Sequence, residues 1–164
     1  MTNQAENTRT EVAVFGAGCF WGVEETFRRL DGVISTAVGY AGGSVENPGY
    51  EAVCSGGTGH AEVARVEFDP EIISYDALLR VFWGCHDPTT LNRQGPDRGT
   101  QYRSVIFVAD ADQRAAAEAS LKEAQPSFGS PIVTQIEDDA PFYRAEEYHQ
   151  QYIQKGGAGG CRII

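Results

Sequence analysis

Short stretches in which hydrophobic residues alternate with polar or small ones recur along this chain. A period of two is typical of β-strands, because successive side chains of a strand point to opposite faces. We predict strands over residues 11–16, 33–40, 60–68, 103–109 and 131–136. Over 60–68 one set of alternate positions is polar and the other is mostly apolar. That stretch is therefore expected to turn one face toward a core.

Four other segments have the apolar spacing or the high alanine content that favours a helix. They cover residues 22–30, 74–86, 110–125 and 141–155, and a short helical turn is expected near 50–55. Ser74 and Asp110 are residue types that cap the N-terminus of a helix. Pro88 follows the second segment, and the residue before a proline resists helical geometry, so this helix should end there.

The central elements follow the order strand, helix, strand, strand, helix, strand. This is the split β-α-β arrangement of ferredoxin-like folds. We therefore predict an α+β fold of two layers, a βαββαβ plait in which helices cover one face of a mixed sheet. Two long loops, over 41–59 and 89–102, interrupt the pattern, and such loops are usually functional. We expect a disordered lead over 1–10, one domain over 11–155 and a flexible glycine-rich tail over 156–164.

The charge of the chain excludes several classes of partner. Its 164 residues include 13 Lys and Arg against 23 Asp and Glu, which gives a net charge of -10. An acidic chain without a basic cluster argues against binding to nucleic acid or to anionic membrane surfaces. The chain has no apolar run of membrane-spanning length and no apolar signal core in its first ten residues. We expect a cytoplasmic protein, and a monomer, since no apolar interface stripe stands out.

The cysteines do not form a framework of disulfides or a structural zinc site. No two of them make a C-x-x-C pair, and the histidines add no ligand pattern at zinc spacing. The residues in question are Cys19, Cys54, Cys85 and Cys161, with His60, His86 and His149. From these spacings we expect no metal site. Thiols stay reduced in the cytosol, so we expect one or two reactive thiols rather than disulfides.

Cys19 is the strongest candidate for a reactive thiol. It lies in the motif GCFWG (residues 18–22), where the first predicted strand gives way to the first predicted helix. Unpaired N–H groups and the positive end of the helix dipole at such a junction stabilise an anion. The thiol should therefore ionise readily to a nucleophilic thiolate. Phe20 and Trp21 would form an apolar wall beside it, which suggests a small, partly apolar substrate group.

Two other interpretations of this motif are possible. Most cysteines are buried and chemically inert. The glycines at 16, 18 and 22 also loosely mimic a dinucleotide-binding turn. That match is poor, because Cys19, Phe20 and Trp21 occupy the positions that would approach a pyrophosphate.

Further motifs follow in order along nearly the whole chain, from Val12 to Cys161. They are GCFWG (18–22), VGYAGG (38–43), NPGY (47–50), CSG (54–56), TGHAE (58–62), HDP (86–88), GTQYRS (99–104), FY (142–143) and EYHQ (147–150). In these motifs the chain resembles the peptide methionine sulfoxide reductases of the A type. It departs from them in the tail, where KGGAGG (155–160) replaces an Asn-Pro-Asn-Gly-Tyr-like segment and no second tail cysteine follows.

The resemblance implies the reaction. Cys19 would attack the sulfur of the S epimer of methionine sulfoxide, free or within proteins, so that methionine leaves and Cys19 becomes a sulfenic acid. Cys161 would act as the resolving thiol and form a disulfide with Cys19. Thioredoxin would reduce that disulfide, or dithiothreitol in vitro, and no bound cofactor is implied. The implied role is the repair of oxidised proteins.

The oxygen of a sulfoxide leaves poorly unless it is protonated or strongly hydrogen-bonded, so the reaction needs an acid near the sulfur. The resemblance assigns this role to Glu62. The alternative is an ordinary solvated strand carboxylate, which is the commoner fate of a glutamate. Burial of Glu62 against Phe20 and Trp21 would instead favour the protonated form that the role requires.

The resemblance assigns roles to other residues as well. Tyr50 and Tyr102, from the two long loops, would hydrogen-bond the sulfoxide oxygen, and Asp97 would orient rather than react. Phe20 and Trp21 would hold the S-methyl group of the substrate.

Two further functions remain open. The first is a cysteine hydrolase in which Cys19 is the nucleophile and His60 or His86 is the base. The second is a module that binds oxidised methionine without turnover. Apart from these, His60 and His149 are expected to be hydrogen-bonded structural histidines. Cys85 is expected to be a buried helix residue.

Overall fold

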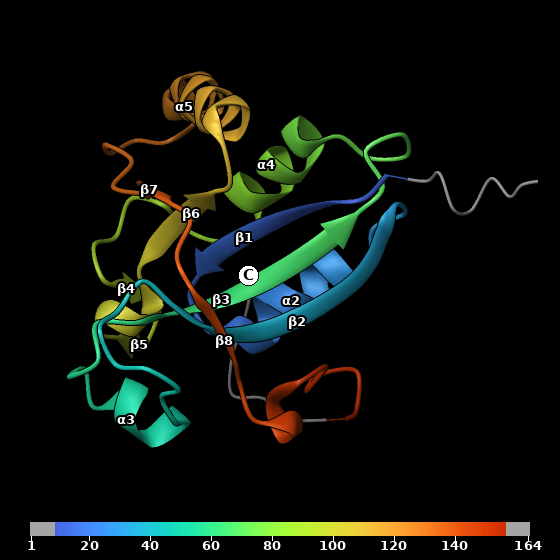
Figure 1. The fold of residues 1–164 in the computed structure, drawn as a ribbon. Helices are drawn as coiled ribbons and strands as arrows, with labels where there is room; N and C mark the ends of the chain where they lie inside the picture. The colour runs from blue at the N-terminus through green and yellow to red at the C-terminus, as the bar shows by residue number, and fades with distance from the viewer. Residues whose placement is uncertain (1–8, 157–164) are drawn as a thin grey trace, which may run out of the picture.

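A computed structural model describes residues 9–156 of the chain. The main sheet has six strands: β1 Glu11–Ala17, β2 Val33–Ala41, β3 Ala61–Phe68, β6 Ser104–Val108, β7 Gln135–Asp138 and β8 Phe142–Arg144 (Figure 1). A separate hairpin is made of β4 Arg93–Gln94 and β5 Asp97–Arg98. The helices are α2 Phe20–Arg28, α3 Tyr50–Cys54, α4 Tyr75–Gly84 and α5 Ala111–Ala124, with 3-10 turns η1 Thr100–Tyr102, η2 Gln125–Ser127 and η3 Glu147–His149.

The strand order of the sheet is β7-β6-β1-β3-β2-β8. Its four central strands pair antiparallel throughout, in the order that a βαββαβ plait produces when each helix crosses over one strand. The outer strand β7 runs parallel to β6, whereas β8 runs antiparallel to β2, so the sheet is mixed. The predicted ferredoxin-like α+β fold is confirmed, with one added strand at each edge.

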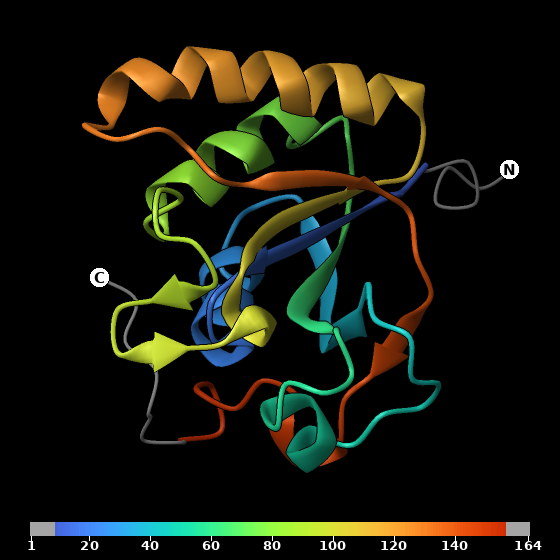
Figure 2. The same cartoon turned by 90° about the vertical axis from the view of Figure 1, so that its left-hand side faces the viewer.

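Helices α2 and α4 pack on one face of the sheet, and α5 lies along α4 (Figure 2). The main core fills the space between these layers. At its centre the ring of Phe15 stacks on Phe27 of α2 at 4.9 Å and on Phe82 of α4 at 5.2 Å between centroids. Burial of large side chains of this kind is the main favourable contribution to folding.

The opposite face of the sheet carries a smaller apolar cluster. Ala61 and Val63 of β3 are fully buried there, and Phe142 of β8 packs against the same cluster. The sequence predicts one polar and one mostly apolar face for this strand, with residues 61, 63, 65 and 67 on the polar face. That prediction is wrong for Ala61 and Val63. Only Arg65 and Glu67, further along, are partly exposed.

The predicted helix over 141–155 is wrong. The chain forms the edge strand β8, then η3 and a series of turns. Tyr143 pairs with Tyr40 across the edge of β2, and the Ala145 amide donates to the Val38 carbonyl at 2.9 Å. Strand β2 offers unpaired backbone groups at its edge, and these outcompete the local helical preference of the segment.

The strand predicted over 131–136 lies later in the chain, at Gln135–Asp138. The Ile132 amide donates to the Gln125 side chain, and the Val133 amide donates to the Pro88 carbonyl. Both amides are thereby bound to loops rather than to the neighbouring strand. Among the described residues, no helix combines the length and the hydropathy needed to cross a bilayer.

Candidate active site

Cys19 is the N-cap residue of α2, directly after β1, as the sequence predicts. Its backbone is extended rather than helical, and the residue is half-buried. At the N-terminus of a helix the first N–H groups lack partners within the helix, and the dipole favours negative charge. The position therefore suits a thiolate.

Gly18 gives this turn its shape. Its φ of +97° is one that residues with side chains rarely adopt, and a Cβ at this position would lie 2.8 Å from Cγ of Gln94. The Gln94 amide accepts a hydrogen bond from the Asp87 N–H and donates one to the Asp87 carbonyl. Because Gln94 is paired with Asp97 in the β4–β5 hairpin, this contact sets the hairpin directly against the Cys19 turn.

Glu62 lies on the core-facing side of β3, the side of the strand that carries Ala64 and Val66. It is only 1% exposed, so the reading as a solvated carboxylate is excluded. Its Oε1 accepts a hydrogen bond of 3.2 Å from the N–H of Phe20, the first residue of α2. The contact brings the carboxyl group to the helix terminus that begins at Cys19.

The two tyrosines that the sequence predicts as site residues come from separate segments of the chain. Tyr50 is the first residue of α3 and Tyr102 is the last residue of η1. Burial raises the pKa of both phenols above the ordinary value. Charge at Asp97 and Cys19 also raises the pKa of Tyr102, so these groups lie within electrostatic range of its hydroxyl. Both phenols are therefore protonated hydrogen-bond donors at neutral pH.

Asp97 and Cys54 lie at the edge of this group. Asp97 opens β5 and is half-buried, and burial raises the pKa of its carboxyl. Cys54 ends α3, the helix that begins at Tyr50, and is exposed. The structure thus places a second thiol near the predicted phenols. Cys161, the predicted resolving residue, lies outside the described residues.

Phe20 and Trp21 are the residues of the predicted aromatic wall, and both of their rings contact the ring of His149. Phe20 is buried, with its ring 5.2 Å from that of His149. The indole N–H of Trp21 donates to Nδ1 of His149 at 2.9 Å, and the indole stacks on Tyr152 at 3.9 Å. The ring of Tyr50 lies 4.5 Å from His149 on another side.

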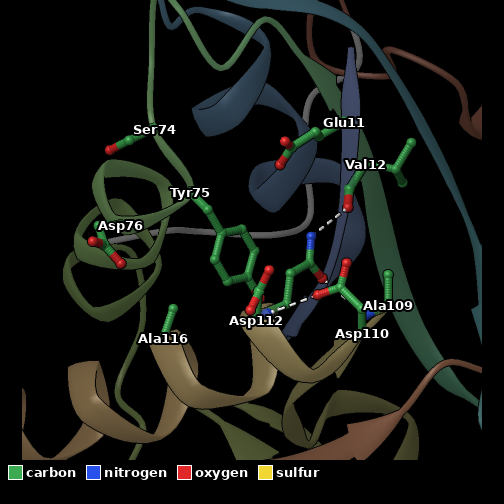
Figure 3. A pocket seen from close by; sticks show the side chains of 10 residues that line it. Glu11, Val12, Ser74, Tyr75, Asp76, Ala109, Asp110, Asp112 and Ala116 are labelled. Atoms are coloured by element: carbon green, nitrogen blue, oxygen red, sulfur yellow. Dashed lines mark hydrogen bonds between the residues drawn. The ribbon is translucent and has the colours of Figure 1, made fainter. Parts of the chain in front are cut away.

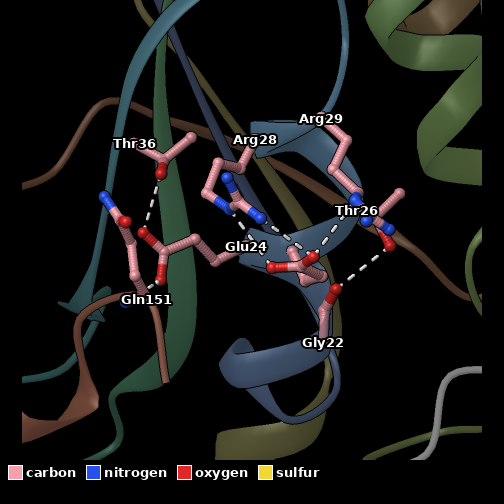
Figure 4. A network of polar contacts seen from close by, with 8 residues as sticks. Gly22, Glu24, Thr26, Arg28, Arg29, Thr36 and Gln151 are labelled. Carbon is pink, nitrogen blue, oxygen red and sulfur yellow. Dashed lines mark hydrogen bonds and ion pairs between the residues drawn. The ribbon is translucent and has the colours of Figure 1, made fainter. Parts of the chain in front are cut away.

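The segment that carries His149, residues 145–152, is here called the C-terminal strap. Two buried side chains attach it to the rest of the fold. The Gln150 amide bonds to both the N–H and the carbonyl of Val38, in the manner of a further strand residue. Glu24 of α2 accepts from the Gln151 N–H through Oε1 and from the Thr36 hydroxyl through Oε2, at 2.7 Å each (Figure 4). The strap is thereby fixed to α2 and β2.

Sequence reasoning did not assign a part in the site to several residues that the structure brings there. They are Tyr40, Glu146, His149, Gln150 and Tyr152. The EYHQ motif over 147–150 was the signal for part of this set, although the helix predicted there would have placed its side chains differently.

The histidines do not supply a base for a hydrolase. His60 accepts from the Gly43 N–H through Nδ1 and donates to the Val45 carbonyl through Nε2. His86 donates to the Phe82 carbonyl through Nδ1 and is bonded to the Ser104 hydroxyl through Nε2. Both ring nitrogens of each are used in this way. Cys85 is buried, as predicted, with its sulfur on the Phe82 carbonyl.

A cavity of about 520 Å³ lies elsewhere, at the start of β1 and between the N-termini of α4 and α5 (Figure 3). Glu11 and Val12 line it, whereas Cys19 follows the other end of the same strand. Its lining includes no thiol. Among the described residues, no cluster of His, Cys, Asp and Glu side chains could hold a metal ion.

The arrangement around Cys19 combines a nucleophile, proton donors and an apolar surface. Glu62 and the phenols of Tyr50 and Tyr102 are the candidate proton donors, and Phe20 and Trp21 are the candidate apolar surface. Proton donation to the leaving oxygen is the assistance that sulfoxide reduction needs.

Comparisons with known proteins agree with this chemistry. The family described as peptide methionine sulfoxide reductase matches residues 11–164. The chain is 63% identical over 156 residues to the peptide methionine sulfoxide reductase MsrA of Methanoculleus marisnigri, covering 94% of this chain and 95% of the relative. Among solved structures, reduced Mxr1 from Saccharomyces cerevisiae superposes with a TM-score of 0.88 at 36% identity, covering 98% of this chain and 92% of Mxr1. Mxr1 in complex with Trx2 gives a TM-score of 0.65 at 25% identity, covering 99% of this chain and 91% of Mxr1. The chain belongs to the peptide methionine sulfoxide reductase family.

Proposed function

We propose that Cys19 is the nucleophile of this reductase, and that it reduces the S epimer of methionine sulfoxide, both free and within proteins. One observation carries the proposal: the buried carboxyl of Glu62 accepts the Phe20 N–H beside Cys19, and Tyr102 lies two residues before Ser104, which pairs with Ala17 at the start of the same turn. Each of these groups supplies what sulfoxide reduction requires, and they come from elements far apart in the sequence.

The thiolate attacks the sulfur and forms a new S–S bond. The sulfoxide oxygen accepts a proton from Glu62 and hydrogen bonds from Tyr50 and Tyr102. The substrate S–O bond and the new S–S bond then break as the hydroxyl group is transferred to the sulfur of Cys19, and the substrate sulfur recovers its lone pair. The products are methionine and a sulfenic acid on Cys19, so the sulfoxide is reduced by two electrons and the thiol is oxidised by two.

The preference for the S epimer is what membership of the family implies, and three groups of the sulfoxide would be distinguished at the site. The S-methyl group lies against Phe20 and Trp21, the oxygen faces the phenols, and the lone pair faces away from the thiolate. The mirror arrangement would place the methyl group on the polar side. A methyl group contributes roughly 1 kcal/mol of burial, which is enough for orientation but not for tight binding.

We further propose that Cys161 resolves the sulfenic acid. Its thiol would displace water and form a disulfide with Cys19, and a dithiol such as thioredoxin would then reduce that disulfide. The similarity to Mxr1, which forms a complex with Trx2, supports thioredoxin as the reductant. The exposed thiol of Cys54 is the alternative, because it lies on the same short helix as Tyr50.

The reaction is tested by supplying the separate S and R epimers of a blocked methionine sulfoxide, with dithiothreitol as reductant. We expect methionine from the S epimer alone, and none from Cys19→Ser. The matched control is Cys85→Ser, because that thiol is buried on the Phe82 carbonyl and a hydroxyl can keep the bond. Turnover by Cys19→Ser would remove Cys19 from the mechanism.

The resolving step is tested by comparing Cys161→Ser with Cys54→Ser. With thioredoxin and its reductase as the only source of electrons, we expect Cys161→Ser to complete one turnover and stop. With dithiothreitol the same variant should continue, because a small thiol can reduce the sulfenic acid directly. Loss of thioredoxin-supported turnover in Cys54→Ser, and not in Cys161→Ser, would transfer the role to Cys54.

A further inference from the structure

We propose that Glu146 is a positioning residue of this reductase. It fixes the position of Tyr50 and of the two residues that contact the aromatic wall, Tyr40 and His149. The proposal rests on the proposed function, since it assigns Tyr50, Phe20 and Trp21 to the sulfoxide site. It adds a residue that does not itself need to touch the substrate.

Glu146 lies in the strap, between β8 and η3, and its two carboxylate oxygens bind groups from two other elements. Oε1 accepts the hydroxyl of Tyr40 in β2 at 3.0 Å, and Oε2 accepts the N–H of Tyr50 in α3 at 3.1 Å. In sequence these contacts span 106 and 96 residues. One side chain thus joins the sheet, the strap and the loop that carries a predicted phenol.

The contact with Tyr50 takes the place of a missing helix cap. The N-cap residue of α3 is Gly49, which has no side chain to accept from the first N–H groups. Helix α3 has only five residues, and a helix of that length is not stable without tertiary support. A carboxylate at its N-terminus satisfies an N–H and interacts favourably with the helix dipole. Glu146 therefore determines where α3 begins, and with it the position of Tyr50.

The same carboxylate reaches the groups behind the aromatic wall. The ring of Tyr40 lies 5.7 Å from that of Phe20, so fixing the Tyr40 hydroxyl restrains the ring that backs Phe20. Oε1 of Glu146 also lies 3.9 Å from Nε2 of His149, whose Nδ1 accepts the indole N–H of Trp21. Tyr50 therefore contacts Glu146 directly, and Phe20 and Trp21 are each linked to it through one intervening residue.

The chemistry of the carboxylate agrees with this role. Burial alone would raise its pKa, but hydrogen bonds from its own backbone, from the Tyr50 N–H and from the Tyr40 hydroxyl outweigh burial and lower the pKa. Glu146 is therefore an acceptor for both donors throughout the neutral range. Its side chain is 38% exposed, so the carboxylate remains in contact with solvent.

Two substitutions separate positioning from charge. Glu146→Ala removes both contacts, and we expect kcat to fall by roughly ten- to a hundredfold, with a smaller rise in KM, because a misplaced donor mainly affects the transition state. Glu146→Gln can keep both contacts: its amide oxygen accepts from the Tyr50 N–H, and its amide N–H₂ donates to the Tyr40 oxygen. We expect Glu146→Gln to recover most of kcat.

The matched control is Glu147→Ala. Glu147 is the next residue, its side chain is 74% exposed, and its carboxylate pairs with Arg144 on the surface. We expect wild-type kinetics from this variant. The second readout is the alkylation rate of Cys19 by iodoacetamide, followed by peptide mass spectrometry, which reports the thiolate without requiring Tyr50. It should be unchanged in Glu146→Ala.

Three outcomes would overturn the proposal. The first is wild-type kcat in Glu146→Ala, and the second is an equal loss in Glu146→Ala and Glu146→Gln. The third is a parallel loss of Cys19 alkylation and sulfoxide reduction, which would indicate general disruption of the site. A failure of the proposed function is distinguishable from all three, because then the wild type itself would reduce neither epimer.

Discussion

His86 is held neutral by burial and takes part in a chain of hydrogen bonds. Its Nδ1–H donates to the Phe82 carbonyl, and its Nε2 is bonded to the hydroxyl of Ser104, which is in turn bonded to the hydroxyl of Thr134 at 2.7 Å. Burial lowers the pKa of His86 to about 4, although part of the residue is still exposed. A proton on Nε2 would place a charge in this buried site, so the folded state resists protonation.

This histidine makes the stability of the fold depend on pH. As pH falls below about 6.5, the unfolded imidazole binds a proton, whereas the folded one does so only near pH 4. The unfolded state therefore binds more protons in this window, and stability is lost as pH falls through it. A tenfold difference in proton affinity is worth about 1.4 kcal/mol. Allowing for the partial exposure, we expect His86 to account for a loss of about 1 to 2 kcal/mol between pH 7 and pH 5.

The measurement is the free energy of unfolding in urea at pH 7 and pH 5, for the wild type and for His86→Gln. The variant cannot titrate in this range, and it retains donor and acceptor groups. All other groups contribute equally to both profiles, so the difference isolates His86. Parallel profiles would show that His86 does not carry this dependence.

The predictability of the candidate site varies from residue to residue. The motifs identified Cys19, Glu62 and Tyr102, and the structure brings these residues close together. Glu146 and Tyr152 could not be found in this way, because their parts depend on contacts with residues about a hundred positions earlier in the chain. Local sequence carries no signal for such contacts, and only the sheet topology decides which segments meet.

At the scale of elements, the strap shows why one prediction failed. Residues 141–155 have the composition of a helix, but the edge of β2 offers unpaired backbone groups. Strand β8 pairs with that edge, and the Gln150 side chain continues the bonding beyond it. The strands and helices of the plait could be predicted because each one buries a periodic apolar face. The strap has no such face and is held mainly by buried polar contacts.

Gln150 is therefore expected to matter for stability. It is 4% exposed, and it bonds the N–H and the carbonyl of Val38 and the carbonyl of Ala145. Gln150→Ala would remove the partner of the Val38 N–H and the side-chain donor to the Ala145 carbonyl, whereas the Val38 carbonyl would keep the Ala145 N–H, so we expect a cost of about 2 to 4 kcal/mol. Chemical denaturation measures this change.

The control is the neighbouring glutamine. Gln151 is exposed, and its contact with Glu24 uses only its backbone N–H, so Gln151→Ala should change stability by less than about 0.5 kcal/mol. Equal costs for the two substitutions would show that the Gln150 amide does not hold the strap.

At the scale of the whole molecule, the main core and the candidate site are separate. The main core lies between the sheet and helices α2 and α4, whereas Phe20, Val38, Tyr40 and Val53 form a second cluster at the site end of α2. Interiors are closely packed, so a cavity in one cluster affects mainly its immediate neighbours. Stability and catalysis should therefore respond to different substitutions.

Leu79 of α4 tests this separation, since it is fully buried in the main core. Leu79→Ala should cost about 2 to 5 kcal/mol of stability through lost burial and the cavity that remains. The same change at Leu91, which is 65% exposed, should cost less than about 0.5 kcal/mol. If the two clusters are independent, kcat of Leu79→Ala equals that of the wild type at temperatures where the variant is fully folded. A fall in kcat at such temperatures, with no change in Leu91→Ala, would mean that a packing change in the main core alters the geometry at Cys19. The two clusters would then have to be treated as one.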